Sequence, residues 1–178
     1  NCKNFKLKIN RNDFENCNIA INTASTSVQI GSSYSISNNT INIPNRNIMT
    51  PIPSPFYRGI VMSQISPHSQ VSANIIGNNC TGQFSSCYSL IRVNNVSFIN
   101  NETHVDANLS NSYIRGLWLM NSNSCNISRN VFTTLPSQVS WIPNSTGIFI
   151  DECGKNDIIE NSFHKYQDHI EVLNSMTG

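Results

Sequence analysis

The chain has 178 residues, of which 11 are basic and 10 acidic, and its net charge at pH 7 is +1. Because only 12% of the residues are charged and they form no basic stripe, the composition argues against a nucleic-acid-binding protein. No apolar run approaches the roughly 18 residues that cross a bilayer. The first residues also lack the apolar core of a signal peptide, so we expect any such segment to have been removed or to lie outside this sequence.

Short β-type segments recur along the chain, with asparagine, serine and threonine between them. There are 29 asparagines but only five lysines, so an AT-rich genome does not explain the asparagines and a structural use is expected. Residues 1–58 hold the segments FKLKI, NIAIN, SVQI and NTINIPN at irregular spacing. Later strands enter from glycine: Gly59-Ile60-Val61-Met62, Gly116-Leu117-Trp118-Leu119 and Gly147-Ile148-Phe149-Ile150, with which we align Leu90-Ile91-Arg92-Val93 and His169-Ile170-Glu171-Val172.

A second repeat is in phase with the glycine-led strands. The segments IIGNNC, FINNET, ISRNVF and IIENSF superpose in three columns of equivalent residues. Successive asparagines of the central column are 23, 29 and 31 residues apart, and this period is typical of a solenoid. The columns are Ile75, Phe98, Ile127 and Ile158; Asn78, Asn101, Asn130 and Asn161; and Cys80, Thr103, Phe132 and Phe163.

This pattern resembles the repeat G-I-x-[IVL]...N-x-I-x-x-N-x-F of the right-handed parallel β-helix in the pectin-lyase-like superfamily, over residues 59–175. The resemblance implies an all-β solenoid of about five to six coils, with long loops at one corner. Inward-facing asparagines would bond to one another from coil to coil as a ladder. We expect one domain over residues 1–178, with less regular coils in residues 1–58 than in residues 59–178. An antiparallel sandwich is the main alternative.

Both ends of a solenoid expose unpaired backbone and normally carry a cap. The last residues, IEVLNSMTG, follow a core strand without an amphipathic cap. We therefore expect the chain to continue in a longer protein, and the alternative is that another chain covers that end.

The six cysteines are not spaced as zinc ligands, because none forms a Cys-x-x-Cys pair and no histidine is placed to join them. The candidate disulfides are Cys80 with Cys87, which would close a small loop, Cys125 with Cys153, at one corner of successive coils, and Cys2 with Cys17. Such pairs favour an oxidising compartment. Buried free thiols are the alternative.

Seven Asn-x-Ser/Thr sequons occur, about as many as this composition produces by chance. Asn101 lies in the expected ladder, where a glycan has no room. Asn108 and Asn144 lie in expected loops and are the candidate N-glycosylation sites of a secreted protein.

Insertions of different length precede the glycine-led strands, and they are expected to form a wall beside one sheet: HVDANLSNSYIR, TTLPSQVSWIPNST and TPIPSPFYR. On that sheet, strand alternation turns Arg92, Trp118 and Phe149 outward, along with Val61 and Glu171. Aromatic faces stack on sugar rings and arginine binds acidic sugars. The candidate glycan-binding residues are therefore Arg92, Trp118, Phe149, Tyr113 and Trp141. The alternative is that the loops fold down and bury Trp118 and Phe149.

Acidic residues cluster late in the sequence. Asp151, Asp168 and Glu171 are the candidate catalytic residues, because paired carboxylates on adjacent coils suit glycoside hydrolysis. The alternative is a solvated acidic edge balanced by Lys155 and Lys165.

The polygalacturonases of the same superfamily carry Asn-Thr-Asp, Asp-Asp, Gly-His-Gly and Arg-Ile-Lys motifs. Here Asn144-Ser145-Thr146 and Asp168-His169 stand at the first two positions, and the other two motifs are missing. The frame thus resembles the family without its catalytic set. Arg92 with Asp151 is too thin a match to the arginine and calcium-binding aspartates of pectate lyases.

Two functions are consistent with these observations. The missing motifs favour an extracellular, cell-surface or virion-surface β-helix that is structural or a glycan-binding adhesin. The alternative is a carbohydrate-active enzyme, either a tailspike-type glycosidase or a polysaccharide lyase. The expected partners are a polysaccharide or surface glycan and further copies or segments of the same chain. No cofactor, metal, nucleic acid or membrane span is expected.

Overall fold

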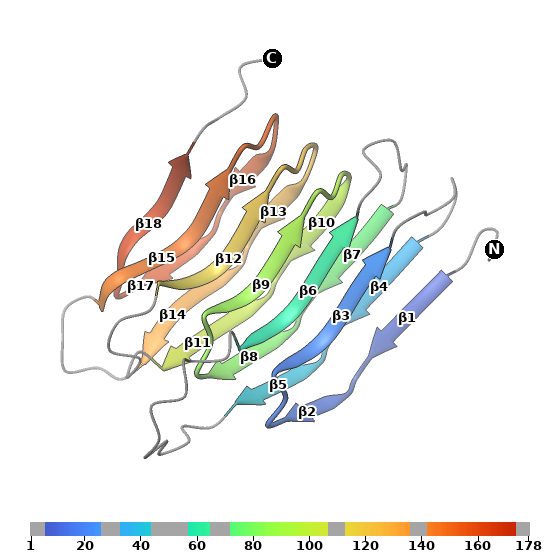
Figure 1. Cartoon of the computed structure of the whole chain (residues 1–178), viewed down its shortest axis with the longest axis horizontal. Coiled ribbons are helices and arrows are strands. Elements are labelled where there is room, and N and C mark those ends of the chain that lie inside the picture. Colours follow the sequence, from blue (N-terminus) through green and yellow to red (C-terminus); the bar gives the residue numbers. More distant parts are fainter. Residues whose placement is uncertain are drawn as a thin grey trace.

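The computed structural model describes residues 6–25, 33–43, 57–64, 72–106, 113–135 and 142–173. These residues form eighteen short strands and no helix (Figure 1). The strands belong to three six-stranded sheets, here named A, B and C. Within each sheet, every pair of neighbouring strands is parallel. The chain is therefore all-β, as predicted.

Successive strands pass in rotation from sheet A to sheet B to sheet C. Sheet A contains β1 (Lys6–Asn10), β4 (Ser33–Ser37), β7 (Ser72–Ile76), β10 (Val96–Ile99), β13 (Asn126–Ser128) and β16 (Asp157–Ile159). Sheet B contains β2 (Asp13–Glu15), β5 (Thr40–Ile43), β8 (Asn79–Gly82), β11 (Glu102–Asp106), β14 (Val131–Leu135) and β17 (Ser162–His164). Sheet C contains β3 (Ile19–Ser25), β6 (Arg58–Gln64), β9 (Ser86–Ile91), β12 (Ile114–Met120), β15 (Ile142–Asp151) and β18 (Tyr166–Leu173).

This topology is compatible with a β-helix solenoid, in which one strand from each sheet makes up a winding (Figure 1). It excludes the antiparallel sandwich, because neighbouring strands in each sheet are parallel and three positions apart in the chain. Parallel neighbours of this kind need a connection that returns to the same end of the sheet. The other two strands of the winding provide that connection.

The core consists of stacked columns of apolar side chains that alternate with outward polar ones. In sheet A, the column Ile36, Ile75, Phe98 and Ile127 is fully buried. The ring of Phe98 meets that of Tyr88 edge-on, with 4.8 Å between the centroids. The buried Tyr88 hydroxyl donates a hydrogen bond to the carbonyl of Asn78 at 2.9 Å, so its polar end is satisfied within the core.

A ladder of asparagines lines the corner between sheets A and B, as the repeat predicts. The Oδ1 atom of Asn101 accepts hydrogen bonds from the backbone nitrogen and Nδ2 of Asn78, both at 3.0 Å. The Nδ2 atom of Asn101 donates to the carbonyl of Ile75 at 2.8 Å and to Oδ1 of Asn130 at 3.1 Å. The same bonds join Asn130 to Asn161. Each buried amide is therefore paired with its neighbours, which removes the cost of burying it.

The ladder also extends into the N-terminal windings, where the sequence repeat was not recognised. Asn12 donates to Oδ1 of Asn39, and Asn39 donates to Oδ1 of Asn78. A residue with positive φ stands directly before these asparagines and turns the chain sharply at the corner. These residues are Arg11, Asn38, Gly77, Asn100, Arg129 and Glu160.

Glycines within three sheet C strands, β6, β12 and β15, leave room for side chains from sheet B. A Cβ atom on Gly116 would lie 2.5 Å from Cδ1 of Phe132, closer than real Cβ atoms approach a neighbour. The requirement is therefore steric, since these glycines do not have positive φ. The same relation holds for Gly147 with Phe163 and for Gly59 with Cys80.

Candidate functional site

The outer face of sheet C is the face that the sequence analysis singles out. The strand register gives its central column as Val61, Ser89, Trp118, Phe149 and Glu171. Trp118 is half-buried and Phe149 is buried. The register confirms the predicted positions of Trp118, Phe149 and Glu171 in one column. The burial of Phe149 agrees with the alternative that this part of the face is covered.

The predicted position of Arg92 in this column is wrong. Ser89 is the residue that pairs with Trp118, so the segment around Arg92 was aligned three residues out of register. Arg92 follows β9 at the corner, exposed and with a φ of 55°. The error arises because Val93 is fully buried at this corner, and its apolar side chain imitates a strand position.

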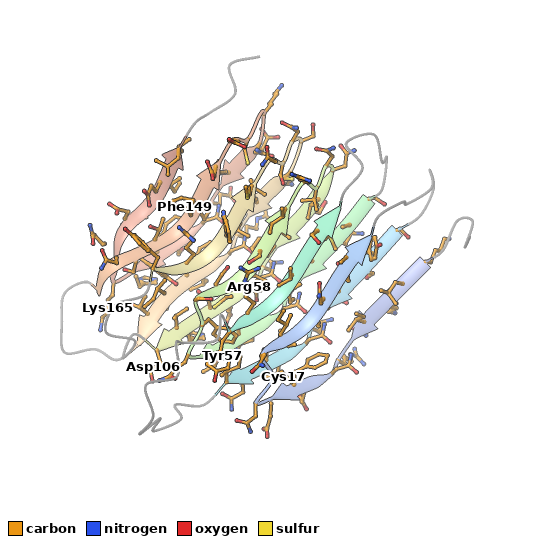
Figure 2. The ribbon with its side chains drawn as sticks, in the orientation of Figure 1. Cys17, Tyr57, Arg58, Asp106, Phe149 and Lys165 are labelled. Atoms are coloured by element: carbon orange, nitrogen blue, oxygen red, sulfur yellow. The ribbon has the colours of Figure 1, made fainter. Side chains whose placement is uncertain are left out.

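Two arginines that the sequence analysis missed lie on this face instead. The register aligns Arg58, Ser86, Arg115, Thr146 and Asp168 in a second column. Figure 2 shows Arg58 on β6 and Phe149 on β15, and strands β9 and β12 run between them in sheet C. A signal for these arginines does exist in the sequence, because each directly precedes the glycine of a glycine-led strand.

Arg115 is packed among three aromatic rings. Its Cζ atom lies 4.0 Å from the ring centroid of Phe149, 5.0 Å from that of Trp118 and 5.8 Å from that of Tyr113. Arg58 approaches the Trp118 ring as well, with its Cζ atom 5.5 Å from the centroid. These distances allow cation–π attraction between the two arginines and the rings.

Charges around Arg115 are only partly balanced. Partial burial lowers the pKa of its guanidinium, while the negative charges of Glu171 and Asp151 oppose that shift. The described residues contain two ion pairs, His104 with Glu102 and Arg129 with Glu160. Neither of these ion pairs includes Arg115. In the described part of the chain, its guanidinium therefore contacts aromatic rings, and the carboxylates around it are more than 4 Å away.

Trp118 adds a hydrogen-bond donor to the same face. Its Nε1 atom is shielded from solvent and has no hydrogen-bond partner among the described residues. A buried indole N–H normally finds an acceptor, but a bound molecule cannot supply one while this atom is shielded from solvent. We name the group of Arg58, Tyr113, Arg115, Trp118 and Phe149 the arginine–aromatic cluster.

The three candidate carboxylates lie on β15 and β18 but at different levels of the sheet. Glu171 is opposite Phe149, and its Oε2 atom accepts a hydrogen bond from Oγ1 of Thr146 at 3.0 Å. Asp151 is opposite Leu173, two positions further along the strand, and Asp168 is opposite Thr146. Asp151 and Glu171 therefore share a face of neighbouring strands, as the sequence analysis expects. Asp168 is exposed near the start of β18.

Some candidate residues fall outside the described part of the chain, namely Trp141, Asn108 and Cys2. Tyr113 is described and is 69% exposed, which leaves its ring free for contacts beyond Arg115. Asn144 is exposed with a φ of 56°, and its backbone nitrogen donates to Oε1 of Gln167 at 2.8 Å. Asn144 therefore lies within β15, at a register shift between Ile142 and Thr146, and not in the expected loop, although it is exposed.

The cysteines are free thiols at all five described positions: Cys17, Cys80, Cys87, Cys125 and Cys153. Cys125 and Cys153 lie at the same corner of successive windings but are not stacked on each other. The residue stacked on Cys125 is Asn156, whose Oδ1 accepts a hydrogen bond from the Cys125 backbone nitrogen. The residue stacked on Cys153 is Ser122, whose backbone nitrogen donates to Cys153 Sγ. The predicted Cys125–Cys153 and Cys80–Cys87 disulfides are thus not supported. Cys17 is free as well, and its predicted partner Cys2 lies outside the described residues. Cys80 and Cys87 are both buried in the core.

The buried thiols are expected to be unreactive in the folded protein. Burial raises the pKa of the Cys125 thiol to about 11 and also raises the pKa values of Cys87 and Cys153. At pH 8 the thiolate fraction of Cys125 is then about one thousandth. In a Cys2→Ser variant, Ellman's reagent at pH 8 is expected to modify only Cys17 quickly and the other thiols after unfolding.

The same titration tests the alternative of disulfides. Fewer than five thiols after unfolding under non-reducing conditions would contradict the free-thiol state.

The raised pKa also predicts a pH dependence of stability. The Cys125 thiol ionises near pH 9 in the unfolded chain but only near pH 11 in the folded protein. Its contribution to the free energy of unfolding is therefore fully present below pH 9 and decreases as the pH rises towards 11.

Comparisons with protein-family models, with curated proteins and with solved structures find no match to this chain. Among the described residues, no group of three or more His, Cys, Asp and Glu side chains could hold a metal ion. The described residues also include no helix of the length and apolarity needed to cross a membrane. The candidate site is therefore defined by the arginine–aromatic cluster and the neighbouring carboxylates.

Proposed function

We propose that this protein is a non-catalytic surface β-helix that binds a saccharide on the outer face of sheet C. The proposal includes a right-handed solenoid of the pectin-lyase-like kind, located outside the cell, on the cell surface or on a virion. The observation that carries it is the arginine–aromatic cluster, in which Arg115 lies 4.0 Å from the Phe149 ring centroid without an ion-pair partner among the described residues.

Three properties of the cluster support saccharide binding. The exposed Tyr113 ring provides a flat apolar surface on which a sugar ring can stack. The guanidinium groups of Arg58 and Arg115 provide donors for hydroxyl or carboxylate oxygens. The backbone that carries Arg58, Arg115 and Trp118 is paired within one sheet, so little backbone entropy is lost on binding.

Replacement of Arg115 tests this function. Arg115→Ala is expected to weaken glycan binding at least about tenfold, because the loss of a charged hydrogen-bond donor costs on the order of 1.5–3 kcal/mol. Binding would be measured on a glycan array and then by isothermal titration calorimetry. Arg92→Asn is the matched control, because Arg92 has positive φ, which asparagine tolerates, and lies outside the cluster. Equal loss in both variants, or no binding by the parent protein, would contradict the proposal.

Glu171 and Asp151 favour the alternative of a carbohydrate-active enzyme. Both act electrostatically on Arg115 and share a face of β15 and β18, an arrangement compatible with paired-carboxylate chemistry. For a binding protein, Asp151→Asn and Glu171→Gln change affinity, and no oligosaccharide is cleaved by the parent protein. Cleavage by the parent that either substitution abolishes would establish the enzyme instead.

A further inference from the structure

The outer face of sheet A differs from the other two faces in that its middle strands carry no charge. The six strands of this sheet lie side by side in the order of the windings (Figure 1). In β4, β7, β10 and β13, every outward side chain is serine, asparagine or isoleucine. A surface in water normally mixes charges of both signs. Four neighbouring strands without a charge therefore favour a face that a partner covers.

Isoleucines point outward on the same face. Ile76 on β7 and Ile99 on β10 are paired in register, and both are partly exposed. Ile159 on β16 belongs to the same outward column and is 52% exposed. Apolar side chains at these positions gain free energy when a second surface removes them from water.

Charged residues flank the uncharged strands, with opposite signs on the two sides. Lys8 on β1 and Asp157 on β16 belong to one outward column, and both are exposed. The two ion pairs among the described residues include neither of them. At the corner beside this face, the exposed Arg11 and Glu160 take corresponding positions in the same two windings. The charge of the face therefore changes sign along the solenoid.

From these features we propose that two copies of this chain form a dimer through the outer faces of sheet A, related by a two-fold axis parallel to the strands. Such an axis reverses the order of the windings and keeps the position along each strand. Lys8 of one copy then faces Asp157 of the other, and this pair forms twice. At the centre of the contact, Ile76 of each copy faces Ile99 of the other.

The charges distinguish this arrangement from the other face-to-face dimer. A two-fold axis parallel to the solenoid would place each Lys8 against the Lys8 of the other copy, which is unfavourable. In the proposed dimer, Arg11 also faces Glu160. One like-charged pair forms at the opposite corner, Lys6 with Lys155. Two opposite pairs against one like pair favour the contact.

The size of the face predicts a weak dimer. Six strands about 4.8 Å apart and about five residues long cover on the order of 450 Å² in each copy. The total of about 900 Å² is smaller than the roughly 1,200 Å² at which standard stable interfaces begin. We therefore expect a dissociation constant in the micromolar range that rises with salt.

Sedimentation velocity tests the dimer. The parent should pass from monomer to dimer as its concentration rises, and no larger species should form, because a two-fold contact closes on itself. Ile99→Lys places a charge at the centre of the contact twice and should weaken dimerisation at least about tenfold. Val131→Lys is the matched control, because Val131 is a partly exposed, outward β-branched residue on sheet B. This control should dimerise like the parent, and circular dichroism checks that both variants are folded.

A charge exchange tests the register without the Ile99 variant. Lys8→Asp and Asp157→Lys should each weaken dimerisation severalfold. The two variants mixed in equal amounts should form a heterodimer about as strongly as the parent, because every position 8 again faces an opposite charge at position 157.

Each other outcome would overturn the proposal. A parent that stays monomeric at the highest concentration reached, or that grows beyond the dimer, excludes this contact. Equal losses in Ile99→Lys and Val131→Lys mean that the contact does not lie on sheet A. A Lys8→Asp variant that dimerises as well as the parent rules out the proposed axis. None of these substitutions touches the arginine–aromatic cluster on sheet C, so glycan binding is decided separately.

Discussion

Asn101→Ala is expected to destabilise the protein by on the order of 3–6 kcal/mol. The substitution removes the Oδ1 acceptor of the Asn78 backbone nitrogen and side chain, and it removes the donor to the Ile75 carbonyl. Asn101 is 1% exposed, so water cannot easily replace these partners. Each buried group left unpaired costs about 1–3 kcal/mol. Equilibrium unfolding in urea, with the midpoint and slope both fitted, measures the loss of free energy.

Asn74→Ala is the control for the ladder. Asn74 is also an asparagine on an inner winding, but its side chain is exposed on the outer face of β7. Its replacement is expected to change the free energy of unfolding by no more than about 0.5 kcal/mol. Similar losses for both variants would contradict the view that the ladder, rather than asparagine content, stabilises the solenoid.

Gly116→Ala is expected to destabilise the protein by on the order of 2–3 kcal/mol, although alanine is normally better tolerated than glycine within a strand. The added Cβ would lie 2.5 Å from Cδ1 of Phe132 and 2.6 Å from the carbonyl oxygen of Gly147. The Phe132 ring is fully buried and stacks on Phe163 with 5.3 Å between the centroids. Neither the ring nor the paired backbone can therefore move away without disturbing a neighbouring winding. Chemical denaturation again measures the change.

Two further variants separate steric crowding from strand propensity. Ala24→Val adds carbon to an exposed position of β3 and is expected to be neutral or slightly stabilising. In Gly116→Ala/Phe132→Leu, the smaller side chain removes the ring contact, so the two substitutions should be less than additive in their cost. A neutral Gly116→Ala variant would contradict the packing described here.

The ladder could be predicted because its chemistry repeats at one place in each winding. A buried asparagine is stable only when its counterparts lie above and below it, so the columns of Asn78, Asn101, Asn130 and Asn161 reveal the winding itself. Asn12 and Asn39 belong to the same ladder and were missed, although each follows an isoleucine by three residues, as Asn78 and Asn130 do. The irregular spacing of the first 58 residues hid that shared signal.

The candidate site was predicted less completely. Trp118, Phe149 and Glu171 could be placed together because each follows a recognisable start of a strand. Arg92 was aligned incorrectly because its winding has Cys87 where the others have glycine. Arg58 and Arg115 were overlooked because they stand before the strand motif, where the sequence does not show which face a side chain occupies.

The amino-acid sequence by itself determined that this chain is all-β, that its strands form repeated windings and that asparagines line one corner. These features follow from local alternation, corner residues and buried amides, which act within a few residues or recur at every turn. Only the tertiary structure decided which arginines contact Trp118 and which cysteines of successive windings are stacked on each other. These relations depend on the register between strands about 30 residues apart in the chain. The physical reason is that this register is set by core columns and backbone pairing between windings, and insertions of unequal length conceal it from a linear alignment.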